Sequence, residues 1–306
     1  MLKSLFEQLA LDYSFFNVFR YLTFRAICGV LTALIFSFIA GPALIRRLER
    51  IGAGQPIRED GPQTHLDKAG TPTMGGVLIL AAVTLSTLLW ADLGNRFVWI
   101  TLLTCIAFGV IGWVDDYEKL ARKNSRGIGS RQKFFWQSLA AFIAALALYL
   151  TAESPAETTL IVPLFKDVAL DLGFGFVVLA WFVITGSSNA VNLTDGLDGL
   201  AIGPLIIAGS AFALIAYLIG NVVFASYLQV HPVPGAGELA VYCGALVGAG
   251  LGFLWFNAPP AMVFMGDTGS LSLGGGLGAV AVVTKHELVL AVIGGLFVLE
   301  TVSVIV

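Results

Sequence analysis

The sequence predicts an all-α polytopic membrane protein, folded as a helical bundle. Hydrophobic residues make up 57% of the 306 residues and charged residues only 12%, against about 45–50% and about 25% in ordinary globular proteins. Apolar stretches of about 20 residues recur along the whole chain, and each is long enough to cross about 30 Å of hydrocarbon. These two observations exclude a soluble domain.

Nine apolar segments are the predicted membrane spans. The eighth is short and rich in glycine, a residue that lets neighbouring helix backbones approach closely in lipid. Residues 1–20 mix acids and aromatics with apolar residues and predict an interfacial lead-in to the first span. No soluble domain interrupts the pattern, so we expect one integral membrane domain over residues 1–306. The spans cover residues 22–45, 74–91, 97–114, 134–151, 173–191, 200–219, 239–257, 269–284 and 287–306.

The positions of lysine and arginine predict the orientation, because basic residues concentrate in cytoplasmic loops. The loops after the first and third spans hold 11 of the 17 basic residues, so we expect both loops to face the cytoplasm. The N-terminus then lies outside, and the loops after the fifth and seventh spans lie inside. Counting crossings therefore places five aspartates at the cytoplasmic face: Asp115, Asp116, Asp195, Asp198 and Asp267.

Asp115 and Asp116 stand side by side where the third span ends. Neighbouring carboxylates repel each other, so the pKa of at least one rises unless a cation or a lysine compensates. One interpretation is that the pair helps to place Mg²⁺ or phosphate, or accepts a proton. The other is that the pair caps the end of the span and pairs with Lys119 or Arg122.

A dense polar segment, Asn189-Ala-Val-Asn-Leu-Thr-Asp-Gly-Leu-Asp-Gly-Leu200, lies between the fifth and sixth spans. Its glycines permit backbone conformations that expose N–H groups to a ligand. The Asp-Gly steps could also be simple turns, and Asn192-Leu-Thr194 matches a glycosylation sequon, which a cytoplasmic position disfavours. So many polar side chains between two spans favour a binding site.

The segment Phe264-Met-Gly-Asp-Thr-Gly-Ser270 leads into the glycine-rich span. The N-terminus of a helix attracts phosphate, but Asp267 would repel a bare phosphate. A cation between them resolves the conflict, because Mg²⁺ is typically held by one or two carboxylates together with phosphate oxygens of the substrate. The alternative is that Asp267 only caps the helix.

The loop before the second span ends in Lys68-Ala-Gly-Thr-Pro-Thr-Met-Gly-Gly76. Lys68 and the hydroxyl groups of Thr71 and Thr73 could reach a substrate, and Pro72 fits the first turn of the second span. The simpler interpretation is a basic flank that only orients the chain.

Five motifs are distributed over nearly the whole chain. They are GTPTMGG (70–76), GWVDDYEK (112–119), NAVNLTDGLDGLA (189–201), GFLWFNAPPAMVFMGDTGS (252–270) and GGLFVLETVSVI (294–305). Taken together, and in this order, they resemble the motifs of the bacterial phospho-N-acetylmuramoyl-pentapeptide transferases. That family belongs to the polyprenyl-phosphate N-acetylhexosamine-1-phosphate transferases.

The resemblance implies a reaction and a role for each motif. Phospho-MurNAc-pentapeptide would pass from UDP-MurNAc-pentapeptide to undecaprenyl phosphate in the presence of Mg²⁺, giving lipid I and UMP for peptidoglycan synthesis. Asp267 would be the Mg²⁺ ligand, and Asp115 and Asp116 the other catalytic acids. Three lysines would contact phosphate, namely Lys119, Lys123 and Lys133. The pocket on the nucleoside side would comprise Lys68, Thr73, Asn192, Leu193, Asp195, Asp198, Phe264, Gly266 and Ser270.

The family's fold has ten transmembrane helices. We therefore expect this chain to hold nine of them and to lack the family's histidine-rich loop and last helix. The resemblance also implies a multi-pass protein of the bacterial inner membrane and a homodimer, and we expect no nucleic-acid partner.

Two other functions compete with this one. The first is a UDP-GlcNAc:polyprenyl-phosphate GlcNAc-1-phosphate transferase of the same superfamily, which differs in the transferred sugar. The second is a cation-coupled transporter, since acids within membrane bundles often serve ion pathways. Transporters place such acids near the midplane, often within inverted repeats, whereas the acids predicted here lie at one face.

Overall fold

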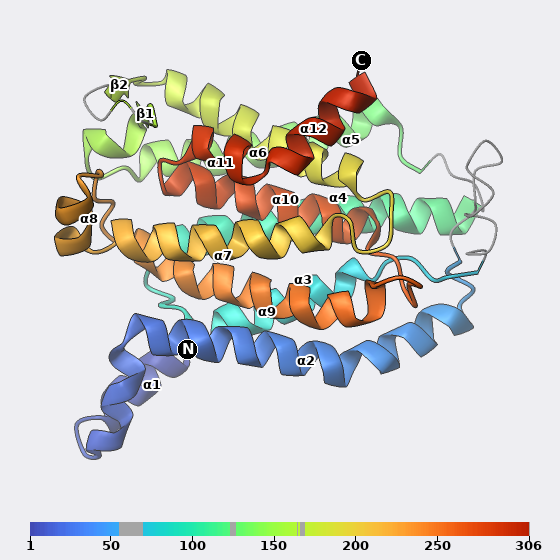
Figure 1. Cartoon of the computed structure of the whole chain (residues 1–306), viewed down its shortest axis with the longest axis horizontal. Helices are drawn as coiled ribbons and strands as arrows, with labels where there is room; N and C mark the ends of the chain where they lie inside the picture. The colour runs from blue at the N-terminus through green and yellow to red at the C-terminus, as the bar shows by residue number, and fades with distance from the viewer. Residues whose placement is uncertain (55–69, 123–126, 164, 166–168, 306) are drawn as a thin grey trace.

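Long helices lie side by side and roughly along the longest axis of the molecule (Figure 1). The computed structural model describes residues 1–54, 70–122, 127–163, 165 and 169–305. The elements, in chain order, are α1 (Leu2–Leu9), η1 (Ser14–Arg20), α2 (Leu22–Arg50), α3 (Gly76–Trp90), α4 (Arg96–Arg122), α5 (Ser130–Leu150), η3 (Pro155–Thr158), β1 (Thr159–Ile161), β2 (Ala169–Asp171), α6 (Gly175–Thr194), α7 (Ile202–Ile219), α8 (Val222–Leu228), η4 (Ala236–Glu238), α9 (Leu239–Asn257), α10 (Gly266–Val283), α11 (Glu287–Ile293) and α12 (Gly295–Ile305).

The prediction of an all-α polytopic membrane protein is confirmed. Helices occupy all nine segments predicted as spans. Within the described residues, six helices are long and apolar enough to cross a membrane, and the bent pair α11–α12 makes a seventh if it counts as one span. The helix α3 is apolar but has only 15 residues. The crossing of the membrane by all nine segments stays a prediction.

Two helices differ in extent or course from the spans predicted for them. The third span was expected to end before Asp115, but α4 continues as a helix to Arg122, so the paired aspartates and Lys119 lie on its last two turns. The ninth span was expected to be continuous, but it bends by 80° between α11 and α12. The bend falls at Gly294, whose φ of −87° and ψ of 26° are not helical, and a Gly-Gly pair offers little resistance to such a kink.

The glycine-rich helix α10 forms the centre of the bundle. Every residue from Thr268 to Val283 is buried. A Cβ atom on Gly274 would lie 2.7 Å from the carbonyl oxygen of Ser187 on α6, and one on Gly276 would lie 2.1 Å from the Tyr242 hydroxyl on α9. Between them, Gly275 would meet the ring of Phe108 on α4 at 2.9 Å. Three successive glycines thus let three helices approach α10 closely, as the packing of membrane helices favours.

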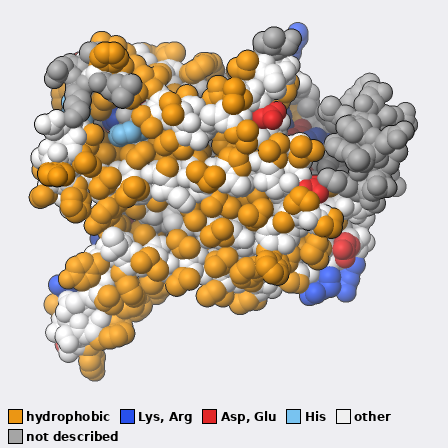
Figure 2. Space-filling model, viewed as in Figure 1, with side chains coloured by type: hydrophobic (Ala, Val, Ile, Leu, Met, Phe, Trp, Pro, Cys, Tyr) orange, Lys and Arg blue, Asp and Glu red, His pale blue; other side chains and the backbone are white. Residues whose placement is uncertain are grey.

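The outer surface of the bundle is apolar. In the space-filling view, hydrophobic side chains cover most of the visible face, and most of the charged side chains visible there lie near the ends of the long axis (Figure 2). Along α2, for example, exposed side chains include Ile27, Leu31, Ile35 and Ile39. So broad an apolar surface fits the acyl chains of lipid better than water.

Ionic contacts also join helices at the end of the bundle that carries β1, β2 and α8. The guanidinium of Arg25 on α2 pairs with both carboxylate oxygens of Glu238. Between α10 and α11, the ammonium of Lys285 lies 4.0 Å from a carboxylate oxygen of Glu287 and 4.0 Å from the centre of the Phe176 ring. These groups hold the ends of neighbouring helices together at the end opposite the acidic cluster described next.

Candidate functional site

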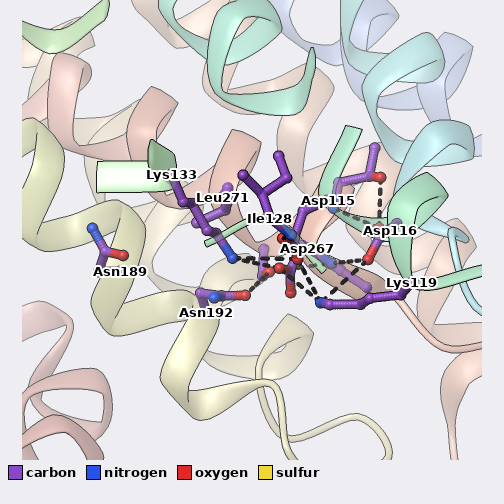
Figure 3. Close-up of polar contacts among 12 residues, drawn as sticks. Asp115, Asp116, Lys119, Ile128, Lys133, Asn189, Asn192, Asp267 and Leu271 are labelled. Carbon is purple, nitrogen blue, oxygen red and sulfur yellow. Dashed lines mark hydrogen bonds and ion pairs between the residues drawn. The ribbon is translucent and has the colours of Figure 1, made fainter. Parts of the chain in front are cut away.

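Three helices bring charged side chains together at one end of the bundle, and a fourth helix, α6, adds an amide. The last two turns of α4 carry Asp115, Asp116 and Lys119, the first turn of α5 carries Lys133, and the first turn of α10 carries Asp267. In Figure 3, these side chains converge on a single centre, with Asn192 of α6 beside them. Residues up to 152 positions apart in the sequence thus meet in one cluster.

Asp116 is held by the N-terminus of α10. Its two carboxylate oxygens accept hydrogen bonds from the backbone N–H of Asp267 (3.1 Å), the backbone N–H of Thr268 (3.0 Å) and the Thr268 hydroxyl (2.7 Å). The first N–H groups of a helix have no partner within the helix, so Asp116 caps α10 from a neighbouring helix. Its side chain is only 3% exposed, and the cap fixes α4 against α10.

The other two carboxylates face the lysines. The Lys119 ammonium lies 2.6 Å from Asp115 Oδ2 and 3.0 Å from Asp267 Oδ2. Lys133 also contacts Asp267 Oδ2, and it lies 3.6 Å from Asp115 Oδ2. Asp115 Oδ1 accepts a further hydrogen bond from the backbone N–H of Ile128 at 2.8 Å. Three carboxylates and two ammonium groups leave the ionised cluster with one net negative charge.

This donor set fits a hard divalent cation. Asp115, Asp116 and Asp267 each offer an oxygen atom, and the three oxygens lie within 4.8 Å of one another. Mg²⁺ binds oxygen at about 2.1 Å, so two of its ligands lie at most about 4.2 Å apart. The side chains must therefore move closer together to share one ion. Because the oxygens of Asp116 already accept three hydrogen bonds from α10, Asp115 and Asp267 are the better placed ligands.

A cavity of about 510 Å³ adjoins the cluster. Two amide side chains of α6, Asn189 and Asn192, line one side of it, and Gln137 of α5 lines the same cavity. The volume lies within the range of sites that bind small molecules. Its other lining residues are Asp115, Lys119, Ile128, Ser130, Lys133, Phe134 and Asp267.

The backbone around Thr73 is joined to the segment that precedes α10. Phe264 N–H donates to the carbonyl of Pro72 at 2.8 Å, and Gly75 N–H donates to the carbonyl of Phe264 at 2.9 Å. Thr73 is buried, and its Oγ1 would lie 2.9 Å from a Cβ added to Gly266. The motifs 70–76 and 264–270, separate in the sequence, thus form one wall beside Asp116.

Gly266 occupies a position that other residues would strain. Its φ is +72°, which L-residues with a side chain rarely adopt. A Cβ there would also lie 2.7 Å from Asp116 Oδ2. The glycine therefore lets α10 begin directly against the capping carboxylate.

The polar segment 189–200, at the end of α6 and just after it, lies beside the same cluster. Asn192 accepts a hydrogen bond from the Ser270 hydroxyl at 2.7 Å, and Asp198 accepts one from the backbone N–H of Ala261 at 3.2 Å. Loss of solvation raises the pKa of Asp195 to about 8, and the nearby charges of Asp267 and Asp116 add to the rise. Asp195 is thus mainly protonated at neutral pH and can donate a hydrogen bond.

Three predicted site residues are not placed in the cluster. Leu193 is 42% exposed and is not among the residues that line the cavity. Lys68 and Lys123 lie outside the described residues. The remaining predicted residues lie in the cluster, along the cavity or in the segments packed against them.

Two amide side chains and one hydroxyl group of the site were not predicted from the sequence. Thr268 anchors Asp116, and Asn189 and Gln137 line the cavity. Asn189 is the first residue of the polar segment 189–200, but it was not among the predicted site residues. Gln137 is a buried amide within a largely apolar stretch of α5. Polar side chains within a membrane helix are costly and commonly functional, and that signal could have identified it.

Two comparisons with known families match this chain. The model of glycosyl transferase family 4 matches residues 98–285, which is more than half of the chain and includes both aspartates of α4 and Asp267. Signature 1 of the phospho-N-acetylmuramoyl-pentapeptide transferases matches residues 68–80, the segment that contains Thr73. The first match covers the helices that build the cluster, and the second covers the segment packed against the residues before α10.

Proposed function

Because the chain belongs to glycosyl transferase family 4, we propose that it transfers phospho-MurNAc-pentapeptide from UDP-MurNAc-pentapeptide to undecaprenyl phosphate. The products are lipid I and UMP. The family supports a nucleotide-sugar donor and a polyprenyl-phosphate acceptor, and the signature over residues 68–80 supports the muramoyl donor. The observation that carries the proposal is the cluster of Asp115, Asp267, Lys119 and Lys133 at the end of an apolar bundle.

The charges of the cluster suit a reaction between phosphates. Phosphoryl transfer depends mainly on positioning and charge stabilisation. Lys119 and Lys133 can neutralise phosphate oxygens of the donor and the acceptor. Asp267, with Asp115 in reach, would hold Mg²⁺, which when bound neutralises the pyrophosphate and the departing UMP.

In the proposed step, an oxygen of the lipid phosphate attacks the phosphorus that carries the sugar. A new phosphorus–oxygen bond forms, the bond to the bridging oxygen of UMP breaks, and UMP leaves with the electron pair. Asp115 orients the attacking phosphate or accepts its proton. The alternative is a two-step route in which a carboxylate oxygen of Asp267 attacks first. Inversion of configuration at the transferred phosphorus supports one step, and retention supports two.

We further propose that the site faces the cytoplasm of a bacterial inner membrane. The basic residues around Arg46–Arg50 and Lys119–Lys133 support this orientation. The lipid phosphate would then reach the cluster from the membrane surface while its prenyl chain stays among acyl chains.

The decisive experiment measures UMP release by the purified chain. UMP should form only when UDP-MurNAc-pentapeptide, undecaprenyl phosphate and Mg²⁺ are all present, and EDTA should abolish it. Asp267→Ala and Asp115→Ala should each lower kcat by about 100-fold or more. Glu118→Ala is the matched control, because Glu118 pairs with Arg122 on the same helix, apart from the cluster.

Three results would contradict the proposal. Near-normal turnover in Asp267→Ala or Asp115→Ala would refute the role of that residue. Activity with UDP-GlcNAc but not with the muramoyl donor would assign the chain to the related GlcNAc-1-phosphate transferases. Transport of a solute without any UMP release would favour a transporter.

A further inference from the structure

The amide orientation of Asn189 is fixed by two acceptors. Its Nδ2 donates to the Thr185 carbonyl at 2.9 Å and to Gln137 Oε1 at 3.0 Å. A backbone carbonyl only accepts, so the nitrogen of Asn189 must face Thr185 and Gln137. Both hydrogens of the Asn189 amide are therefore used, and its oxygen is turned toward the cavity and the charged cluster (Figure 3).

Asn192, one turn further along α6, presents a hydrogen-bond donor where Asn189 presents an acceptor. Its Oδ1 accepts from the Ser270 hydroxyl at 2.7 Å, so its Nδ2 is left as a donor. The cavity wall thus offers an acceptor from Asn189 and a donor from Asn192, three residues apart on one helix. Side chains at this spacing lie on the same helix face.

The burial of Gln137 carries a cost in folding free energy. It is 1% exposed, and its Nε2 has no hydrogen-bond partner in the part of the chain that the structure describes. An unsatisfied buried donor is unfavourable. Its Oε1 nevertheless provides the second acceptor that orients Asn189, and Gln137 lines the same cavity.

A neutral acceptor beside a neutral donor selects an amide-like group. Asn189 Oδ1 would repel phosphate oxygens, so this part of the wall does not suit the pyrophosphate or the lipid phosphate. In an N-acylhexosamine 1-phosphate, the acylamino group at C2 stands next to the carbon that carries the phosphate. It has one N–H donor and one carbonyl acceptor, and it must lie close to the groups that hold the phosphate.

We propose that Asn189 and Asn192 bind the C2 acylamino group of the transferred sugar, with Gln137 as the positioning residue that sets the amide of Asn189. Asn189 accepts from the N–H of that group, and Asn192 donates to its carbonyl. The uracil ring also has a donor beside an acceptor, but the ribose separates it from the phosphates. It belongs nearer Asp195, Asp198 and Phe264. This assignment rests on the proposed transferase function.

The test compares two donors that differ only at C2. UMP release is measured with undecaprenyl phosphate and Mg²⁺, from UDP-MurNAc-pentapeptide and from its 2-deoxy analogue, which has hydrogen in place of the acetamido group. The wild type should prefer the first donor in kcat/KM. Gln137→Leu and Asn189→Leu should lower this preference about tenfold or more, because the acceptor is misoriented or lost, so kcat/KM should fall much further for the acetamido donor than for the 2-deoxy donor.

Two further variants separate positioning from folding. Gln137→Glu keeps an acceptor for Asn189 and should retain the preference. Ser138→Ala removes a buried hydroxyl without a described partner on the same helix and should behave like wild type. If one of the two leucine variants fails to fold, the other variant still tests whether the amides recognise the C2 group.

Equal loss with both donors, or no preference in the wild type, would overturn the role of the amides while leaving the transferase function intact. Absence of UMP release by the wild type from either donor would overturn the transferase function and this inference with it.

Discussion

The two neighbouring aspartates of α4 have different surroundings. The carboxylate of Asp116 lies at the N-terminus of α10 and accepts three hydrogen bonds there, whereas the carboxylate of Asp115 faces the lysines and the cavity. A carboxylate whose oxygens are bound by a helix terminus orients its neighbours, while one that faces lysine side chains and the cavity is available to a ligand. We therefore assign positioning to Asp116 and the handling of the attacking phosphate to Asp115.

Gly266 should tolerate no side chain. Gly266→Ala places a methyl group 2.7 Å from Asp116 Oδ2 at a φ of +72°, so the cap must move and Asp267 with it. We expect the rate of UMP release to fall about tenfold to 100-fold, since small misplacements of catalytic groups are costly. Gly186→Ala on α6 is the control, because nothing lies within 4 Å of a Cβ there. Equal activity in the two variants would refute the steric argument.

Asp195 should make stability depend on pH. Its pKa is about 8 in the folded chain and about 4 in an unfolded chain. Between these values the folded state binds the extra proton, so the free energy of unfolding falls as pH rises from about 4 to about 8. Asp195→Asn cannot titrate, so in EDTA it should melt at a higher temperature than wild type, by a margin that widens from pH 5 to pH 8 and then levels off. A margin independent of pH would contradict the raised pKa.

At the scale of helices, hydroxyl groups join α6 to α10 where glycine brings them close. Ser187 donates to the carbonyl of Gly274 at 2.8 Å, and Ser188 donates to the carbonyl of Leu271 at 3.0 Å. Such bonds between membrane helices are modest individually, about 1 kcal/mol or less. Together with the glycine contacts, these hydrogen bonds fix the position of α6 along α10, and with it the position of the α6 asparagines beside Asp267.

The junction between α10 and α11 contains a buried lysine and a buried glutamate whose charged atoms lie 4.0 Å apart. The side chains of Lys285 and Glu287 are 3% and 1% exposed. Removing one partner leaves an uncompensated buried charge, while removing both does not. Lys285→Met should therefore lower the melting temperature in detergent by about 5 °C or more, and Lys285→Met with Glu287→Gln should recover most of the loss. A double variant no more stable than the single one would show that the pair acts through packing alone.

Some elements could be predicted from the sequence and others could not. Runs of apolar residues located every long helix because lipid requires length and hydrophobicity. They did not reveal the extension of α4 to Arg122, where charged side chains continue a helix that lies beyond the apolar run. They also did not reveal the bend at Gly294, because two glycines within an apolar stretch fit either a straight or a broken span.

At the scale of the whole molecule, the apolar surface and the two polar ends define how the bundle sits in a membrane. The end with the cluster and the end with β1, β2 and α8 lie at opposite ends of the long axis (Figure 1). An arrangement that spans the bilayer must place these ends on different sides.

Cysteine labelling tests this orientation. The three native cysteines lie on helices and can be replaced by alanine. Single cysteines are then introduced at Arg131, at the cluster end, and at Glu153, at the other end. An impermeant maleimide should modify Arg131→Cys in inside-out vesicles only and Glu153→Cys in right-side-out vesicles only. Modification of both in the same vesicles would refute the transmembrane arrangement.

The candidate site was only partly visible in the sequence. Acids and lysines stand out in an apolar chain, so Asp115, Asp116, Asp267, Lys119 and Lys133 could be selected by type and by counting crossings. The different roles of Asp115 and Asp116 could not be predicted from the sequence, because they depend on which helix each side chain faces. The partnership of Gln137 with Asn189 also depends on the packing of α5 against α6, which spacing along the chain does not encode.

The cap that Asp116 provides for α10 joins residues about 150 positions apart, and this has a consequence for how the chain is made. When α4 first enters the bilayer, α10 has yet to be synthesised, and the two acids have no helix terminus to bind. Until α10 is synthesised, an unpaired carboxylate in the middle of the hydrocarbon would be unfavourable in free energy. On the last turns of α4, the carboxylate can stay hydrated. The placement of the pair at a helix end therefore suits the order of synthesis as well as the chemistry, and the arrival of α10 completes the site.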